Sequence, residues 1–174
     1  MIQNYSRYKL LQEFFDYPRK DFQIRELSRK IKLAQISVIN HLKELVKENL
    51  IIKEHKSVYP SFRANMDNEM FKLLKKQNLI LRIKSSGLID FLWNKTAPKT
   101  IILYGSYAKG ESLEESDIDI FIIGNEKEIN LEKFEEKIGK KIHILFEKDP
   151  KKIPKELKNN LVNGIILKGY LKLF

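Results

Sequence analysis

The apolar positions in the first third of the chain alternate between helical and extended spacing. Three stretches repeat apolar residues every three or four positions, which predicts helices over 7–15, 22–31 and 34–48. Two shorter stretches have strand-like composition and predict strands over 50–55 and 58–64. Pro60 lies in the second of these and favours the edge of a sheet, because proline cannot donate a ladder hydrogen bond. Two short helices, a tight turn and a longer helix are typical of a helix-turn-helix arrangement.

The rest of the chain changes from helical to alternating patterns. A longer helix is expected over 68–83 and a further helical turn or two over 88–93. Beyond them, extended and helical segments alternate. We expect strands over 101–104, 118–122 and 141–146, helices over 131–138 and 154–161, and a closing segment over 164–171. This order predicts an α+β protein whose back part is a mixed sheet with helices on one face.

The candidate chemistry lies in residues 101–123. An apolar run stops at Gly105, whose missing Cβ permits a tight turn and the close approach of a phosphate. Ser106 follows with a hydroxyl and a backbone N–H that can meet an anion at the start of a short helix. Asp117 and Asp119 are two apart in an extended pattern, so both carboxylates point to the same face. Such carboxylates repel each other unless a cation lies between them, and Mg²⁺ with a nucleoside triphosphate suits an oxygen site of this kind.

These residues resemble the signature of the DNA polymerase β-type nucleotidyltransferase superfamily, and especially the small minimal nucleotidyltransferases of archaea and bacteria. The resemblance implies Mg²⁺-dependent transfer of a nucleoside monophosphate from a nucleoside triphosphate to a hydroxyl acceptor, with pyrophosphate released. It implies that Asp117 and Asp119 are the catalytic metal ligands. It also implies that Gly105 and Ser106 bind the triphosphate, and Lys109 is a further nucleotide-binding candidate.

The sequence departs from the family at the third metal ligand. The family holds two Mg²⁺ ions with three carboxylates, and this chain has His143 where the third is expected. His143 is a candidate metal ligand as a neutral imidazole, but imidazole suits Mg²⁺ poorly. Glu147 shares the face of His143 on a straight strand and is a substitute candidate. Three readings stay open: an active enzyme, a site with one metal, and a site that binds nucleotide without turning it over.

Composition limits the class of protein. A length of 174 residues fits one domain or two small ones, and 43% hydrophobic residues are ample for a packed core. The absence of cysteine excludes disulfides and thiolate chemistry. No apolar run approaches the roughly 20 residues of a spanning helix, and the N-terminus lacks the apolar core of a signal peptide. We therefore expect a cytoplasmic protein without membrane contact.

The net charge of +10 is concentrated at the front of the chain. Residues 1–66 contain 13 basic and 7 acidic residues, residues 67–96 contain 6 and 3, and residues 97–174 contain 14 and 13. A basic front joined to a nearly neutral back suggests that the front binds a phosphate backbone.

The front of the chain, residues 6–66, resembles the winged helix-turn-helix DNA-binding domains. The resemblance rests on Ile-Arg-Glu-Leu-Ser-Arg over 24–29 and Ser-Val-Ile-Asn-His-Leu-Lys-Glu-Leu over 37–45. It implies that the third helix enters the major groove of double-stranded DNA. The candidates for base contacts are Gln35, Ser37, Asn40, His41 and Lys43, and those for phosphate contacts are Arg25, Arg29, Lys30, Lys32, Lys53, Lys56 and Arg63.

We therefore predict a winged helix-turn-helix domain over 1–66, a helical connector over 67–96 and a minimal nucleotidyltransferase domain over 97–174. A long connecting helix favours a homodimer, because many winged helix proteins pair to meet two half-sites. The leading hypothesis is a nucleotidyltransferase with a DNA-binding domain. The alternative is a DNA-binding transcriptional regulator whose back domain is weakly active or inactive and senses a nucleotide or a partner protein. A third hypothesis, which rests on family analogy alone, is that the chain is the antitoxin-like partner of another protein.

Overall fold

The computed structural model describes residues 5–55 and 59–171. Contacts divide the chain into two compact units, a front unit over Met1–Lys75 and a back unit over Lys76–Phe174. The division falls inside one continuous helix, α4, which runs over Glu69–Ser86. This boundary between the units, after Lys75, differs from the domain boundaries at 66 and 96 that the sequence predicted.

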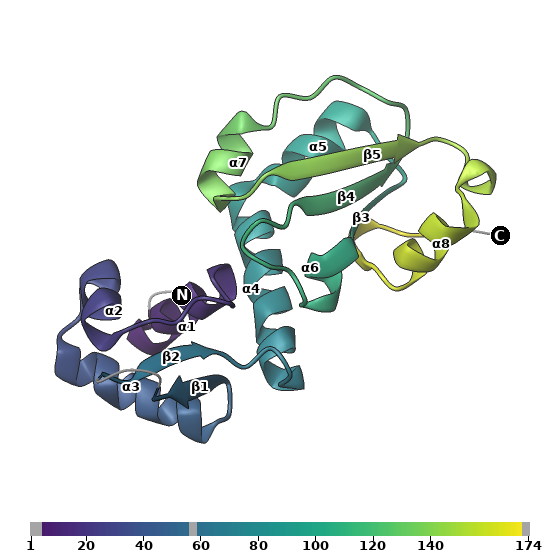
Figure 1. Cartoon of the computed structure of the whole chain (residues 1–174). Helices are drawn as coiled ribbons and strands as arrows, with labels where there is room; N and C mark the ends of the chain where they lie inside the picture. Colours follow the sequence, from purple (N-terminus) through teal and green to yellow (C-terminus); the bar gives the residue numbers. More distant parts are fainter. Residues whose placement is uncertain (1–4, 56–58, 172–174) are drawn as a thin grey trace. The chain divides into compact units, whose positions relative to one another are not determined.

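The front unit consists of three helices followed by a two-stranded hairpin (Figure 1). Its elements are α1 (Ser6–Asp16), α2 (Ile24–Ile31), α3 (Gln35–Lys47), β1 (Ile51–Glu54) and β2 (Ser61–Ala64). The two strands pair antiparallel, with Ile51 opposite Ala64. The number, type and order of these elements are as predicted, whereas the assignment to the winged helix-turn-helix family stays a prediction.

One boundary in the front unit differs from the prediction for a physical reason. The predicted second helix begins at Phe22, but α2 begins at Ile24. Phe22 instead forms two backbone hydrogen bonds with Phe62 of β2, of 2.7 and 2.9 Å. Both phenylalanines are buried, so this bridge ties the segment before α2 to the hairpin and prevents it from continuing the helix.

The core of the front unit is built from the apolar positions that defined its helices. Leu10 and Phe14 of α1, Leu27 of α2 and Leu42 of α3 are each at most 1% exposed. Fourteen buried residues form this cluster, including Phe71 at the start of α4. Burial of such side chains contributes about 1.5–3 kcal/mol each, which holds the three helices on the hairpin.

The back unit contains a four-stranded mixed sheet in the order β5-β4-β3-β6. Its strands are β3 (Thr100–Tyr104), β4 (Ile118–Ile123), β5 (Ile142–Glu147) and β6 (Ile165–Gly169). β3 is antiparallel to β4 and β6, and β4 is parallel to β5. The helical elements are α5 (Leu88–Thr96), α6 (Gly105–Lys109), α7 (Glu132–Ile138), the 3₁₀ turn η2 (Pro150–Lys152) and α8 (Lys155–Val162). A mixed sheet with helices is thus confirmed.

The prediction that the helices cover one face is wrong, because both faces of this sheet are apolar. Ile101, Ile120 and Ile122 belong to a core cluster that includes residues of α4, α5 and α7. Ile102 and Phe121 belong to another cluster with Ile153 and with Leu161 of α8. Neighbouring strand residues point to opposite faces, so the fully buried residues of β3 need cover on both sides.

No helix among the described residues is both long and apolar enough to cross a membrane. The predicted homodimer stays a prediction, since the structure holds a single chain.

Candidate functional site

The candidate site lies where β3 ends and β4 begins. β3 ends at Tyr104, which lies opposite Asp119 in the antiparallel pair. Gly105 follows in the left-handed region with φ +73°, and it begins α6. A Cβ added at Gly105 would lie within 3.0 Å of Oδ2 of Asp119. The turn therefore needs glycine both for its backbone angle and for the space that the Asp119 carboxylate occupies.

The two predicted carboxylates are close together at the start of β4. Asp117 is exposed directly before the strand, whereas the side chain of Asp119 is only 30% exposed. Burial raises the pKa of Asp119, the neighbouring His143 lowers it, and the charge of Asp117 raises it again. The charge of Asp117 thus acts on the carboxylate of Asp119, as their spacing on an extended segment predicted.

His143 joins this pair through the parallel pairing of β4 and β5. It lies opposite Asp119, and Nδ1 of His143 is 3.6 Å from Oδ1 of Asp119. The imidazole is 57% exposed, so it faces solvent beside the carboxylate. The structure therefore places His143 beside Asp119.

Glu147 is not brought to the site. It shares the parity of His143, but it lies opposite Ile123 at the other end of the strand pair. The two residues are four positions apart, which is roughly 13 Å along the strand. An oxygen of Glu147 instead accepts a hydrogen bond of 2.9 Å from the backbone N–H of Asp149. Its proposed role as a substitute metal ligand is not supported by this position.

The fit to the family's metal site is incomplete. Across residues 5–55 and 59–171, no three His, Asp or Glu side chains lie close enough together to share a metal ion. An arrangement of two ions and three carboxylates therefore does not fit this chain. The residues present offer two carboxylates for a hard cation such as Mg²⁺ and one imidazole nitrogen.

The predicted nucleotide-binding residues flank the carboxylates. Ser106 is half-buried in the first turn of α6, and its backbone oxygen accepts a hydrogen bond of 2.9 Å from the N–H of Glu111. Lys109 is exposed in the last turn of the same helix. Both residues are thus accessible, although nothing bound in the structure tests their role.

Side chains that the sequence did not single out form hydrogen bonds near the starts of β4 and β5. Glu135 of α7 accepts hydrogen bonds of 2.9 Å from Nζ of Lys141 and from the backbone N–H of Ile142. These bonds lower the pKa of Glu135, the backbone bond most. Nζ of Lys140 donates a bond of 2.6 Å to the backbone oxygen of Glu114, in the loop that carries Asp117. These long-range contacts have no local sequence signal.

The aromatic ring beside the carboxylates was also missed. Tyr104 is 8% exposed, and its ring packs edge-to-face against Phe121 with centroids 6.4 Å apart. Burial raises the pKa of Tyr104, and the charge of Asp119 adds to this effect. Its strand position next to Gly105 identified it only as an apolar residue.

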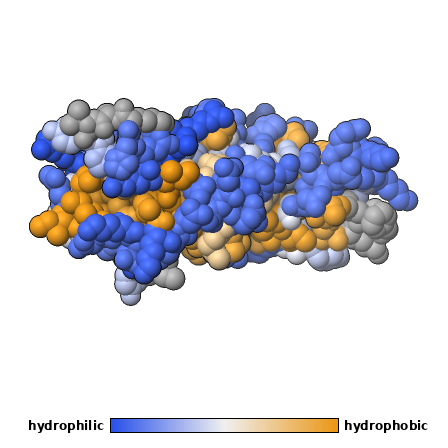
Figure 2. Space-filling model, turned by 60° about the horizontal axis from the view of Figure 1, so that its bottom comes forward, coloured by the Kyte–Doolittle hydropathy of each residue, from blue (hydrophilic) through white to orange (hydrophobic). Residues whose placement is uncertain are grey.

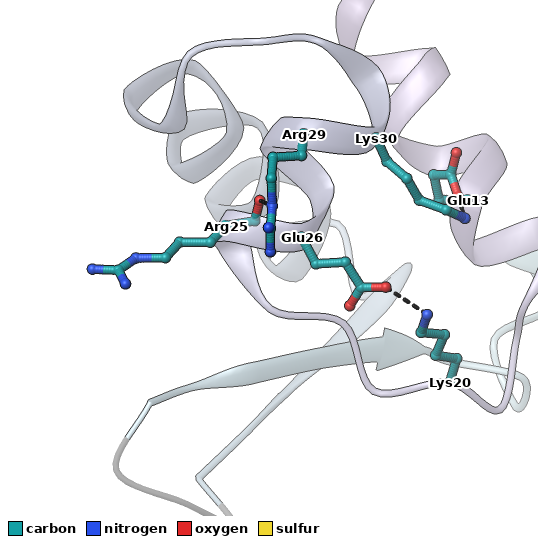
Figure 3. Close-up of polar contacts among 6 residues, drawn as sticks. All are labelled: Glu13, Lys20, Arg25, Glu26, Arg29 and Lys30. Atoms are coloured by element: carbon teal, nitrogen blue, oxygen red, sulfur yellow. Dashed lines mark hydrogen bonds and ion pairs between the residues drawn. The ribbon is translucent and has the colours of Figure 1, made fainter.

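The predicted DNA-contacting residues of the front unit fall into two groups. Figure 3 shows Arg25 extending away from α2, whereas Lys30 turns to Glu13, with which it forms an ion pair. Arg63 also forms an ion pair, because its Nε lies 2.6 Å from Oε1 of Glu54. Of the predicted contact residues on α2 and α3, Ser37 and His41 are half-buried, and the others are exposed, including the paired Lys30: Arg25, Arg29, Lys30, Gln35, Asn40 and Lys43. Lys56 lies outside the described residues.

An apolar surface accompanies these polar side chains. Ile36 of α3 is 75% exposed, and a groove of about 260 Å³ beside α3 is lined by Ile24, Ile39, Leu42, Lys43, Val46, Lys53, Pro60 and Phe62. Figure 2 shows a hydrophobic area bordered by hydrophilic residues on the front unit. The predicted contact of α3 with the major groove stays a prediction.

Comparison with known proteins adds to the geometry of the back unit. Residues 84–168 match the family model described as the nucleotidyltransferase domain. The matched range contains Gly105, Ser106, Asp117, Asp119 and His143. The match covers slightly less than half of the chain and supports transfer of a nucleoside monophosphate in general.

A shorter likeness links the chain to a curated archaeal protein. It is 67% identical over 27 residues to a protein of Methanocaldococcus jannaschii that bears the name "Putative protein adenylyltransferase". The aligned stretch is 16% of this chain and 27% of that protein, so the chain spans about a quarter of the relative's length.

Proposed function

We propose that the back unit transfers a nucleoside monophosphate from a nucleoside triphosphate to a hydroxyl group. In this reaction the hydroxyl oxygen attacks the α-phosphorus, the bond from that phosphorus to the bridging oxygen of the β-phosphate breaks, and pyrophosphate leaves. The observation that carries the proposal is the fit between Gly105 and Asp119, which places a carboxylate against the glycine turn. The family match over residues 84–168 supports it.

Each residue of the site has a role in this proposal. The backbone of Gly105 and the N–H and hydroxyl of Ser106 bind the triphosphate, and Lys109 attracts its negative charge. Asp117 and Asp119 would repel that charge, so a divalent cation must join them to the phosphates. We propose Mg²⁺, which would act as a Lewis acid on the phosphoryl oxygens. The three-carboxylate set of the family is not present, so the proposal requires no second ion.

We further propose that the acceptor is a hydroxyl group on a protein. This part rests on the printed name of the relative from M. jannaschii, which describes adenylyl transfer to protein. Serine, threonine and tyrosine side chains are the protein hydroxyls available for such a reaction.

The test is transfer of label from a nucleoside triphosphate labelled at the α-phosphate. The protein is incubated with each triphosphate, Mg²⁺ and a mixture of cellular proteins, and both pyrophosphate and label in protein are measured. We expect both products from the wild type and none from the double variant Asp117→Asn, Asp119→Asn. Glu111→Gln is the control, because it neutralises one carboxylate at an exposed position of the loop that carries Asp117. Equal products from the double variant would contradict the proposal.

A second candidate function concerns the front unit. We propose that it binds double-stranded DNA, because Arg25, Asn40 and Lys43 are exposed on α2 and α3. Arginine and lysine would contact phosphates, and asparagine can bond the edge of adenine in two places. If the back unit proves inactive, the chain is a DNA-binding regulator that senses a nucleotide or a partner protein.

Salt dependence of duplex binding tests this second function. Fluorescence anisotropy of a labelled duplex gives the slope of log K against log salt, to which each phosphate contact adds about 0.9. We expect Arg25→Ala and Lys43→Ala each to reduce the slope. Lys30→Ala should have a smaller effect, since its ammonium group is paired with Glu13. A slope unchanged by Arg25→Ala and Lys43→Ala would overturn the assignment.

A further inference from the structure

The helix α3 carries a second apolar stripe besides the one that it buries in the core of the front unit. The buried stripe consists of Val38, Leu42 and Leu45. The second, which we call the outer stripe, recurs at intervals of three and four residues and consists of Ile36, Ile39, Lys43 and Val46. This spacing places the four side chains on one side of the helix over about three turns. Ile36 is 75% exposed, so the described residues of the front unit leave this side of α3 partly uncovered.

The outer stripe borders the groove of about 260 Å³ beside α3. Ile39 and Val46 line the groove from the helix, and Pro60 and Phe62 line it from the hairpin and the residue before β2. Phe62 is 6% exposed, so the groove reaches down to the core. Six of its eight lining residues are apolar. Apolar side chains of a ligand would gain about 25 cal/mol for each Å² that they bury in such a groove.

The two charged residues that line the groove are lysines. Lys43 belongs to the outer stripe, and Lys53 of β1 lies opposite Phe62 in the register of the hairpin. Residues opposite each other in an antiparallel pair point to the same face, so Lys53 extends from the face of the hairpin that buries Phe62. Both lysines are exposed, and neither forms an ion pair with another residue in the ranges 5–55 and 59–171. Their ammonium groups can therefore meet carboxylates of a ligand.

Charge and polarity together select the kind of ligand. The same surface on a second copy of the chain would bring lysines against lysines, and like charges across an interface are unfavourable. Double-stranded DNA matches the charge, but its phosphates would lose hydration against the apolar lining of the groove. A protein helix with one apolar face and acidic residues beside it matches both the lining and the lysines. Residues 1–66, with 13 basic and 7 acidic residues, favour an acidic partner as well.

We propose that the groove and the outer stripe bind an acidic amphipathic helix of another protein. Positions 36, 39, 43 and 46 repeat as the a and d positions of two heptads, so a helix with the same apolar repeat can pack along α3. Lys43 fixes the alignment, because a single charged residue in such a seam favours one register. The inference concerns the front unit and does not rest on the proposed nucleotidyl transfer.

A displayed library of helical peptides tests the inference. Each peptide has about 14 residues, which is long enough to pair with three turns of α3. Apolar residues are fixed at the a and d positions, and the other positions are random. Selection on the full-length protein should enrich Asp and Glu at the positions that flank the apolar seam. One enriched peptide, labelled with a fluorophore, then gives the Kd for each variant by anisotropy.

Two substitutions at exposed positions separate the apolar and the charged contact. Ile36→Ser should weaken peptide binding about 10-fold by removing buried apolar surface. Lys43→Glu should weaken it by a similar factor, because it places like charges together. The matched controls are Met70→Ser and Lys9→Glu, which make the same kinds of change at exposed positions on α4 and α1 and should bind as the wild type does.

A charge exchange identifies the partner of Lys43. A peptide in which the enriched carboxylate is replaced by lysine should bind Lys43→Glu more tightly than it binds the wild type. Thermal unfolding checks that every variant folds, as the exposure of the substituted side chains leads us to expect.

Three results would overturn the inference. One is a selection that enriches no acidic peptide, or an enriched peptide that binds all the variants equally. Another is a dimer, detected by analytical ultracentrifugation, that dissociates in Ile36→Ser, since this would assign the outer stripe to a second copy of the chain. The third is a loss of duplex binding in Ile36→Ser with peptide binding unchanged, which would assign the stripe to DNA.

Discussion

Substitution of Gly105 by alanine separates the two reasons for glycine in the candidate site. The backbone at Gly105 has φ +73°, a left-handed conformation that costs an alanine about 1–2 kcal/mol. The new Cβ would also lie within 3.0 Å of Oδ2 of Asp119, where ordinary contact begins at 3.4 Å. The carboxylate must then move away from the turn to restore an ordinary contact. We expect Gly105→Ala to lose both stability and cation-dependent nucleotide binding.

Gly87→Ala is the matched control for the backbone effect. Gly87 separates α4 from α5 with φ +84°, and a Cβ there would meet nothing within 4 Å. The two variants should therefore suffer similar strain and lose about 4–8 °C in melting temperature per kcal/mol, as expected for a unit of about 100 residues. Only Gly105→Ala should lower nucleotide binding by calorimetry and pyrophosphate release. Equal activity of the two variants would refute the argument that Gly105 makes room for Asp119.

Three further predictions concern stability. Burial raises the pKa of Asp119 in the folded protein, so the charged form of this residue lowers the stability of the fold as the pH rises through that pKa. Asp119→Asn should therefore have a higher melting temperature than the wild type at pH 7, and the difference should close below about pH 3.8. The hydrogen bonds from Ile142 and Lys141 lower the pKa of Glu135, so its carboxylate stabilises the fold above about pH 4.5 and this stabilisation is lost in acid. Glu135→Gln should have a lower melting temperature than the wild type at pH 7, and a difference that persists in acid would contradict this. Leu161→Ala should cost about 2–5 kcal/mol in denaturant unfolding, because Leu161 of α8 is 1% exposed on the second face of the sheet, and a loss near zero would mean that α8 does not cover this face.

Local patterns predicted most of the secondary structure. The spacing of apolar residues located α1, α3 and the strands to within a few residues, because each pattern reflects burial of one helix face or strand face. The break between the predicted helices over 68–83 and 88–93 was also located, although α4 continues to Ser86 and Gly87 alone separates it from α5. The cover on both sheet faces was missed, since strand burial does not state which helix supplies it.

The candidate site was predictable only as far as it is local. A period of two placed Asp117 and Asp119 on one face, and the structure brings them together. The position of His143 beside Asp119 depends on the parallel pairing of β4 and β5, which no residue pattern specified. Glu147 was a candidate because it lies on the same strand face as His143. Two residues on one face can still lie at opposite ends of the strand, as these two do.

The charges of the front unit show a similar limit. Net charge identified a basic segment, but the ion pair of Lys30 with Glu13 joins α2 to α1 across the fold. The pair of Arg63 with Glu54 likewise follows from the register of β1 and β2. Composition counts these cations as available for phosphate, whereas the structure shows that each already has a partner.

The central claim is that Asp117 and Asp119 bind a nucleoside triphosphate through a divalent cation, and it is tested without knowledge of the acceptor. Calorimetry compares the affinity for each triphosphate in the presence of Mg²⁺ or Mn²⁺ with the affinity in a chelator. We expect wild-type protein and Glu111→Gln to bind more tightly with the cation, and the double variant Asp117→Asn, Asp119→Asn to show no such difference. A cation effect of the same size in the double variant, or no triphosphate binding by the wild type, would contradict it.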